Sequence, residues 1–428
     1  MISPTVSGVS FIFIVIGITT ANVFGLERND LPDTLDNRIY DKDIHSVWLG
    51  NQEWEFSAPV IESGTDQKLE LRFDDLSGDT RSFGYTMIHC NMNWQRSQLS
   101  ESEYLSGFGR GWVKDSKQSF NTTYFYINYQ LVFPEEDCIP VLSGNYVLVV
   151  YDEADPENII LTRRFYVAEK TMDVKATLRQ PAHGSNSATG QQLHFSMNFN
   201  NADIRDPKSE ITVIAIQNSR FDKQKTFENP YLIKPGEMEF TDPDGGIFEA
   251  GNEFRTLDIK SMRYQTENIA DIEFRNPYYH VLMKADKIRS NKPWFSKSDL
   301  NGNYYIDKEK SDDRHTEADY VYVHFNLELP SVYSANKVYI AGAFNDWKKD
   351  AGSLMQFNPD NGYFEITLLM KQGLYDYCFL MENIEDRVID EYEIEGSYYE
   401  TENDYSIFIY FHDQFKRYDH LAGYLPIK

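Results

Sequence analysis

The sequence is poor in cysteine, in basic residues and in long apolar runs. Only 3 cysteines occur in 428 residues, too few for a disulfide-stapled scaffold, so we expect stability to come from hydrophobic cores. Cys90 and Cys138 can pair in an oxidising compartment, which would leave Cys378 over. The alternative is that all three are small buried hydrophobic residues.

The shortage of basic residues limits the range of partners. Lys and Arg total 41 against 67 for Asp and Glu, which gives a formal net charge of -26. Such a protein repels polyanions, so nucleic acid and anionic membrane surfaces are excluded as expected partners.

One apolar run is present, at the N-terminus. The first 25 residues carry no charged side chain, and residues 9–18 (VSFIFIVIGI) have the length of a signal-peptide core but are too short to span a bilayer. We therefore expect a secretory signal peptide at 1–25, a mature chain that begins near Leu26, and no direct membrane insertion.

No segment sustains the 3.6-residue apolar period of a long helix, whereas aromatic residues make up 15% of the chain, with 29 Tyr and 28 Phe. Short alternating runs broken by turn residues predict an all-β fold of tandem immunoglobulin-like β-sandwich domains. The expected strands are 45–49, 69–73, 82–90, 123–133, 145–151, 159–167, 173–179, 192–199, 210–217, 254–261, 280–286, 321–329, 338–341, 363–369, 374–381 and 405–411.

Turn clusters and polar stretches predict the domain boundaries. After the signal peptide we expect an N-terminal lead at 26–44, a first β-sandwich at 45–169, a middle β-rich domain at 170–300, a polar loop or linker at 301–319, a third β-sandwich at 320–412 and a C-terminal tail at 413–428.

Catalytic and metal-binding motifs are missing. The sequence has no nucleophile elbow, phosphate loop or dinucleotide fingerprint, and no pair of its 9 histidines has the spacing of a zinc site on a helix. We expect no catalytic, cofactor-binding or metal-ligating residue, no cofactor and no small-molecule ligand. The protein is predicted to be a binding protein and not an enzyme.

Residues 338–347 (VYIAGAFNDW), 362–366 (GYFEI) and 373–379 (GLYDYCF) resemble the early-set immunoglobulin-like domain of glycogen-binding modules. In that family the tryptophan that matches Trp347 stacks on a sugar ring, which gives an alternative function as an exported α-glucan-binding protein. The family's second platform tryptophan is absent here, because the matching place reads Glu382-Asn383-Ile384-Glu385.

A more extensive resemblance covers nearly all of the mature chain. The pattern is similar to the type IX secretion system plug protein family, and it is carried by residues 85–94 (YTMIHCNMNW), 103–108 (EYLSGF), 119–122 (SFNT), 143–146 (SGNY), 162–165 (TRRF), 217–218 (QN), 251–255 (GNEFR), 394–396 (IEG) and 401–405 (TENDY). The resemblance implies a periplasmic protein of Bacteroidetes-type bacteria, associated with the inner side of the outer membrane. Its expected partner is the outer-membrane translocon barrel, whose periplasmic opening it would plug.

A plug needs a docking surface, and we expect it on the first sandwich, in the connection 98–122 and the nearby strand ends. Reversible docking calls for an interface of modest area with a few anchor residues. The candidate partner-binding residues are Asn91, Asn93, Trp94, Phe108 and Trp112, and the alternative for each of the three aromatic residues is a place in the core.

Overall fold

The structure is a computed structural model that describes residues 35–52, 55–182, 185–199, 204–241, 245–413 and 416–428. The expected signal peptide at 1–25 and the greater part of the expected lead, 26–34, lie outside the described residues.

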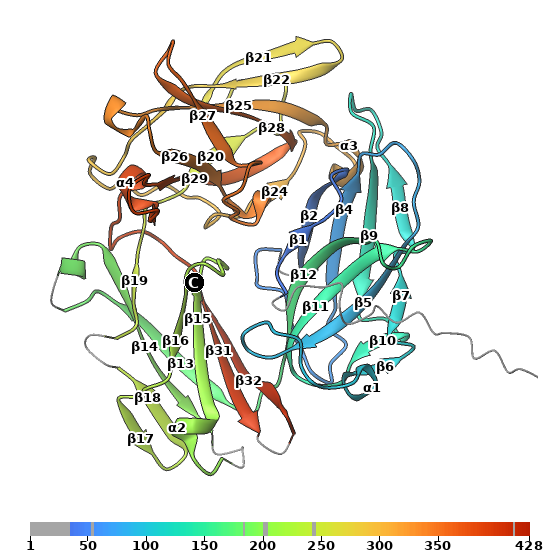
Figure 1. Ribbon diagram of the computed structural model, residues 1–428, viewed down its shortest axis with the longest axis vertical. Coiled ribbons are helices and arrows are strands. Elements are labelled where there is room, and N and C mark those ends of the chain that lie inside the picture. The colour runs from blue at the N-terminus through green and yellow to red at the C-terminus, as the bar shows by residue number, and fades with distance from the viewer. Residues whose placement is uncertain (1–34, 53–54, 183–184, 200–203, 242–244, 414–415) are drawn as a thin grey trace, which may run out of the picture.

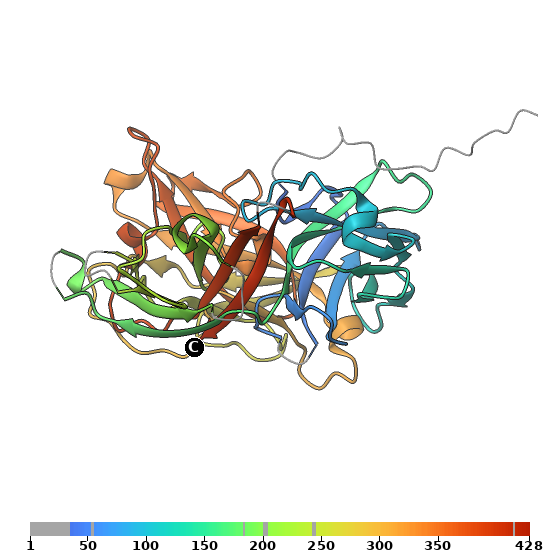
Figure 2. The same ribbon diagram turned by 90° about the horizontal axis from the view of Figure 1, so that it is seen from below.

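The prediction of an all-β fold is confirmed. The strands form three groups that we call the first, second and third domains, and the first domain lies to one side of the other two in both views (Figures 1 and 2). Every expected strand overlaps an observed one. The helices are single turns of three or four residues.

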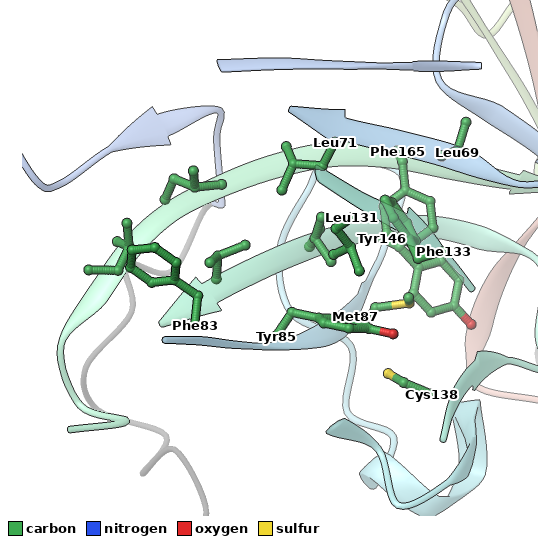
Figure 3. Packing of buried hydrophobic residues seen from close by; sticks show 14 of the residues in the cluster. Leu69, Leu71, Phe83, Tyr85, Met87, Leu131, Phe133, Cys138, Tyr146 and Phe165 are labelled. Atoms are coloured by element: carbon green, nitrogen blue, oxygen red, sulfur yellow. The ribbon is translucent and has the colours of Figure 1, made fainter. Parts of the chain in front are cut away.

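The first domain is a sandwich of a sheet in the order β1-β12-β11-β5-β7, with β3 beside β12, and a sheet in the order β2-β4-β9-β8. Its core lies between these sheets, and Figure 3 shows Cys138 beside Tyr85 and Met87 in it. The elements are β1 (Arg38–Ile39), β2 (Ile44–Asn51), β3 (Val60–Glu62), β4 (Leu69–Asp75), β5 (Phe83–Cys90), α1 (Glu101–Tyr104), β6 (Leu105–Gly107), β7 (Arg110–Trp112), β8 (Asp115–Gln118), β9 (Ile127–Phe133), β10 (Cys138–Pro140), β11 (Gly144–Asp152) and β12 (Ile159–Ala168).

The second domain is a sandwich of the sheets β13-β14-β18-β17, with β19 beside β14, and β16-β15-β31-β32. Two stretches of chain far apart in the sequence therefore build one core, which includes Phe195, Val213 and Ile407. The elements are β13 (Asp173–Arg179), η1 (Ser185–Ser187), β14 (Gly190–Asn198), α2 (Pro207–Glu210), β15 (Ile211–Gln217), β16 (Gln224–Phe227), β17 (Leu232–Lys234), β18 (Glu237–Phe240), β19 (Ile247–Glu249), β31 (Tyr405–Asp413) and β32 (Tyr418–Ile427).

The third domain is inserted between β19 and β31 of the second. Its 11-stranded sheet follows the path β20-β29-β26-β27-β28-β25-β22-β21, with β23 beside β25 and with β24 and β30 beside β29. Strands from both halves of this path share one core. The elements are β20 (Arg255–Asp258), β21 (Ile269–Arg275), β22 (Tyr278–Met283), β23 (Asp286–Lys287), β24 (Tyr304–Ile306), α3 (Arg314–Glu317), β25 (Tyr320–Glu328), η2 (Ser331–Tyr333), β26 (Lys337–Ala341), η3 (Ala343–Asn345), β27 (Leu354–Asn358), β28 (Tyr363–Lys371), β29 (Gly373–Glu382), β30 (Ile389–Asp390) and α4 (Tyr392–Glu395).

Strand pairing differs from the expected boundaries in two places. β20 and β22, expected in the middle domain, pair with β29 and β25 of the third. β31, expected in the third sandwich, pairs with β15 of the second domain, and the expected tail forms β32 beside it. Local alternation reports which face of a strand is buried, not which strand lies next to it. The alternation in the sequence therefore could not predict which distant segments pair with each other.

The first and second domains share a hydrophobic interface. β5 is buried along its whole length, because one face lies in the first domain's core and the other packs toward β15, β31 and β32. Ile88 and Val149 from one side meet Ile216 and Phe408 from the other in a single cluster. Continuous burial of both faces indicates a fixed arrangement of these two domains.

Candidate functional site

Trp94 lies in the interface between the first and second domains and not on the surface. Only 6% of the residue is exposed, and its ring packs edge-on against Tyr166 and Phe221. The Arg164 guanidinium lies 4.5 Å from the ring centroid. Trp94 therefore serves as a packing residue, and the expectation that it anchors a partner is not supported by its position.

Asn91 and Asn93 form the turn that follows β5. The Asn91 side-chain oxygen accepts hydrogen bonds from the backbone N–H of Asn93 at 3.0 Å and of Gln95 at 2.9 Å. In this turn the N–H of Met92 donates to Asp419 of β32 at 2.9 Å. The Asn91 side chain thus holds a turn at the domain interface, while Asn93 remains exposed.

Phe108 and Trp112 are exposed on the outer margin of the first domain. Phe108 is 80% exposed and stands between Gly107 and Gly109, whose φ values are +90° and +71°. A side chain at 107 would meet the backbone of Asp137 at 2.5 Å, so the turn that presents Phe108 requires glycine there. Trp112 ends β7, the last strand of its sheet in Figure 1.

Further exposed apolar side chains occur in the β8–β9 loop and at β10 of the same domain. We call the set the exposed edge of the first domain: Phe108, Trp112, Phe120, Phe125, Ile139 and Val141. Ser106 of β6 is paired with Ile139 of β10, which joins the two parts that carry Phe108 and Ile139. The sequence analysis did not single out the last four members, although Phe120 lies in the expected docking connection 98–122. The aromatic positions of residues 119–126 are a signal that could have found Phe120 and Phe125.

Trp347, the candidate for sugar stacking, is half-buried where the second and third domains meet. The Arg220 guanidinium lies 4.0 Å from the centroid of its ring, and Phe254 packs at 5.6 Å. The ring also closely approaches Gly302, where a Cβ would lie 2.5 Å from the indole. These neighbours pack against the ring and give Trp347 a packing role.

A cavity of about 320 Å³ lies where all three domains meet. Its lining combines aromatic side chains with charges of both signs, and it includes Glu55, Arg163, Asp222, Tyr304 and Trp347. Arg163 is buried, and its guanidinium lies 3.5 Å from the Asp346 carboxylate, so the lining charges are at least in part balanced within the protein.

The chain is similar to a known protein family and to a solved structure. The model of the first domain of type 9 secretion system plug proteins matches residues 44–169. A crystal structure at 2.30 Å resolution of a hypothetical protein from Parabacteroides merdae ATCC 43184 is 32% identical, with a TM-score of 0.88, and the match covers 92% of this chain and 99% of that one. The chain belongs to the type IX secretion system plug protein family.

The recognition made from the sequence is confirmed, and the family match supports a role in the type IX secretion system. No curated protein matches the chain. Within the described ranges, the structure contains no helix that is long and apolar enough to cross a membrane. The same residues include no group of three or more His, Cys, Asp or Glu side chains arranged to hold a metal ion.

A buried ion pair joins the first and third domains of the chain. Lys371 Nζ lies 2.6 Å from Asp74 Oδ2, and both side chains are nearly inaccessible to solvent. Asp74 also accepts hydrogen bonds from the Tyr320 hydroxyl and the Asn128 amide, each at 2.7 Å. Burial lowers the pKa of Lys371. The partners of Asp74 come from β9, β25 and β28, and Lys371 also donates to the carbonyl of His315 in α3 at 2.7 Å. Separating the two domains would therefore expose unpaired charges.

A second polar cluster joins the second and third domains. Arg220 lies in the loop after β15, and its guanidinium donates to Glu391 Oε2 at 2.8 Å and to Asp222 Oδ2 at 2.9 Å. Lys223 donates to the Tyr392 hydroxyl at 2.6 Å. Burial opposes ionisation of Glu391, yet Arg220 and Lys223 lower the pKa of that carboxyl overall. The three domains are therefore in contact with one another through polar as well as apolar side chains.

Proposed function

We propose that this protein closes the periplasmic opening of the outer-membrane translocon barrel of the type IX secretion system. It would be exported to the periplasm and would dock reversibly on the inner side of the outer membrane. Family membership supports a role in this secretion system. The role needs a body that does not deform and a surface that can engage and release the barrel.

The exposed edge of the first domain is the observation that carries the proposal. Its six apolar side chains are each at least 37% exposed, and Phe108 and Phe120 reach 80% and 70%. Aromatic residues such as Phe108, Trp112 and Phe120 are enriched among interface anchors. The edge belongs to the family-matched region, residues 44–169.

The buried polar contacts between domains support the same role. A plug must resist movement of its parts when the barrel opens or when substrate pushes against it. The buried Asp74–Lys371 pair and the Arg220 cluster both cross domain boundaries. The arrangement supports docking as a single unit, with engagement and release at the rim and not by internal rearrangement.

The test is co-purification of the translocon barrel from outer-membrane extracts with tagged variants of this protein. Phe108→Ser together with Trp112→Ser is expected to reduce the recovered barrel at least about tenfold, because two exposed anchors are lost. The matched control is Phe295→Ser, since Phe295 is 79% exposed but belongs to the third domain. Equal loss in both variants, or no barrel with the unaltered protein, would reject the proposal.

A further inference from the structure

β8 is an edge strand with one unoccupied side. It pairs with β9, and the N–H of Ser119 donates to the carbonyl of Tyr126 at 2.8 Å. In an antiparallel pair, residues two apart direct their N–H and C=O groups to the same side. Lys117 and Asp115 therefore face β9, whereas the backbone groups of Ser116 and Gln118 point away from it. Among the described residues, no strand pairs with this outer side.

The neighbouring residue shows that this side accepts a hydrogen-bonding partner. Phe120 is two residues beyond Gln118 and faces the same way, and its N–H donates to the carbonyl of Thr316 in the third domain at 2.9 Å. Thr316 thus takes the place that a further strand would take at Phe120. The free backbone at Ser116 and Gln118 continues directly from this existing contact.

Side chains leave room for an added strand. All four residues of β8 are exposed, in contrast to the mostly buried β9 and β4. Trp112 lies three residues before β8 and Phe120 two residues after it, so exposed aromatic rings stand near both ends of the free backbone. An exposed edge of this kind is a template for strand addition, and the flanking rings can receive alternate side chains of the added strand.

The charges around β8 indicate the chemistry of the added strand. Lys114 is paired with Glu135 at 2.7 Å and Lys117 with Asp313 at 3.1 Å, so both nearby lysines already have acidic partners. Exposed acidic side chains remain at Asp115, Glu136 and Asp312. An apolar segment that also carries Lys or Arg complements these acidic side chains.

We propose that the docking partner adds an extended segment, with apolar and basic side chains, as an antiparallel or parallel strand on β8. The inference rests on the proposed function, because it takes the periplasmic rim of the translocon barrel as the source of that segment. The added strand hydrogen-bonds the backbone of Ser116 and Gln118, and its apolar side chains contact Trp112 and Phe120. Main-chain hydrogen bonds hold the added strand, and the acidic side chains around β8 favour basic residues in it.

The test separates the backbone N–H of Ser116 from its side chain. Ser116→Pro removes the outward N–H while the bonds from Asp115 and Lys117 to β9 stay available, because proline is tolerated on the solvent side of an edge strand. Ser116→Ala is the matched control, since it keeps the N–H. With the purified translocon barrel as probe, we expect at least about tenfold weaker binding for Ser116→Pro and unchanged binding for Ser116→Ala.

Amide hydrogen exchange of the unaltered protein supplies a second measurement in case Ser116→Pro does not fold. Exchange at Ser116 and Gln118 is expected to slow when the barrel binds. If the barrel binds, the two variants bind equally and these amides are unchanged, strand addition is wrong while the proposed function stands. If the unaltered protein does not bind the barrel, both fail. Protection of these amides in the isolated protein, together with dimers in sedimentation, would identify a second copy as the occupant and overturn the inference.

Discussion

Replacing Lys371 by methionine should weaken the protein far more than the loss of an ordinary lysine. Methionine keeps the apolar stem but removes the charge that lies 2.6 Å from Asp74. Asp74 would retain the Tyr320 and Asn128 hydrogen bonds and remain buried without a counter-ion. Removing one partner of a buried ion pair lowers the free energy of unfolding by about 3 to 5 kcal/mol.

The assay is urea unfolding followed by tryptophan fluorescence and by circular dichroism. With a slope of about 3 kcal/mol per molar urea, the first transition should move down by roughly 1 to 1.7 M. The assay remains valid if the domains unfold in separate steps, because the earliest step in which one domain detaches from the others reports the loss of this contact.

Lys117→Met is the matched control for this prediction. Lys117 forms an ion pair with Asp313 across the same boundary, at 3.1 Å, but its side chain is 71% exposed. An exposed pair contributes about 0 to 1 kcal/mol, so its transition should barely move. The account of the buried pair is refuted if Lys371→Met unfolds at the same urea concentration as Lys117→Met.

Two further predictions concern buried titratable groups. Burial lowers the pKa of His89 to about 4 and, with nearby Arg and Lys charges, that of His315 to about 3. The stability that these neutral histidines contribute is complete well above about pH 6.5. It is lost as the pH falls to about 4 for His89 and to about 3 for His315, because the unfolded chain then binds protons that the folded one does not. His89→Gln should therefore lose less stability than the unaltered protein between pH 7 and 4 in urea unfolding, and equal slopes would contradict this. Burial also raises the pKa of Cys90 and of Cys138 to about 12, and the three free cysteines should react with a thiol reagent only after unfolding. Reaction of a single thiol in the unfolded protein would instead indicate a Cys90–Cys138 disulfide.

The strands of the fold were predictable because their signal is local. β25 alternates buried and partly exposed residues along most of its length, which is the pattern of a strand with one covered face. β32 lacks that alternation, since its first six residues are all buried between the second domain's core and the first domain. Because this run lacks a clear periodicity, the sequence predicted a C-terminal tail here and not a strand.

The candidate site was predictable only in part. Phe108 and Trp112 are exposed as expected, whereas Trp94 is buried by Phe221 and Tyr166, which come from other parts of the chain. Whether an aromatic residue at a strand end is an anchor or a core residue depends on what packs over it. That information resides in contacts between distant segments, above all those made by the second domain, and no local pattern contains it.

Cross-linking of the endogenous complex tests the central claim most directly. Purification of this protein from outer-membrane extracts with an amine-reactive cross-linker should recover the translocon barrel linked to Lys114 and Lys117, which are 60% and 71% exposed beside the proposed docking edge. Lys292, exposed in the third domain, should give no link. Links confined to the third domain, or a purified complex without the barrel, would contradict the account.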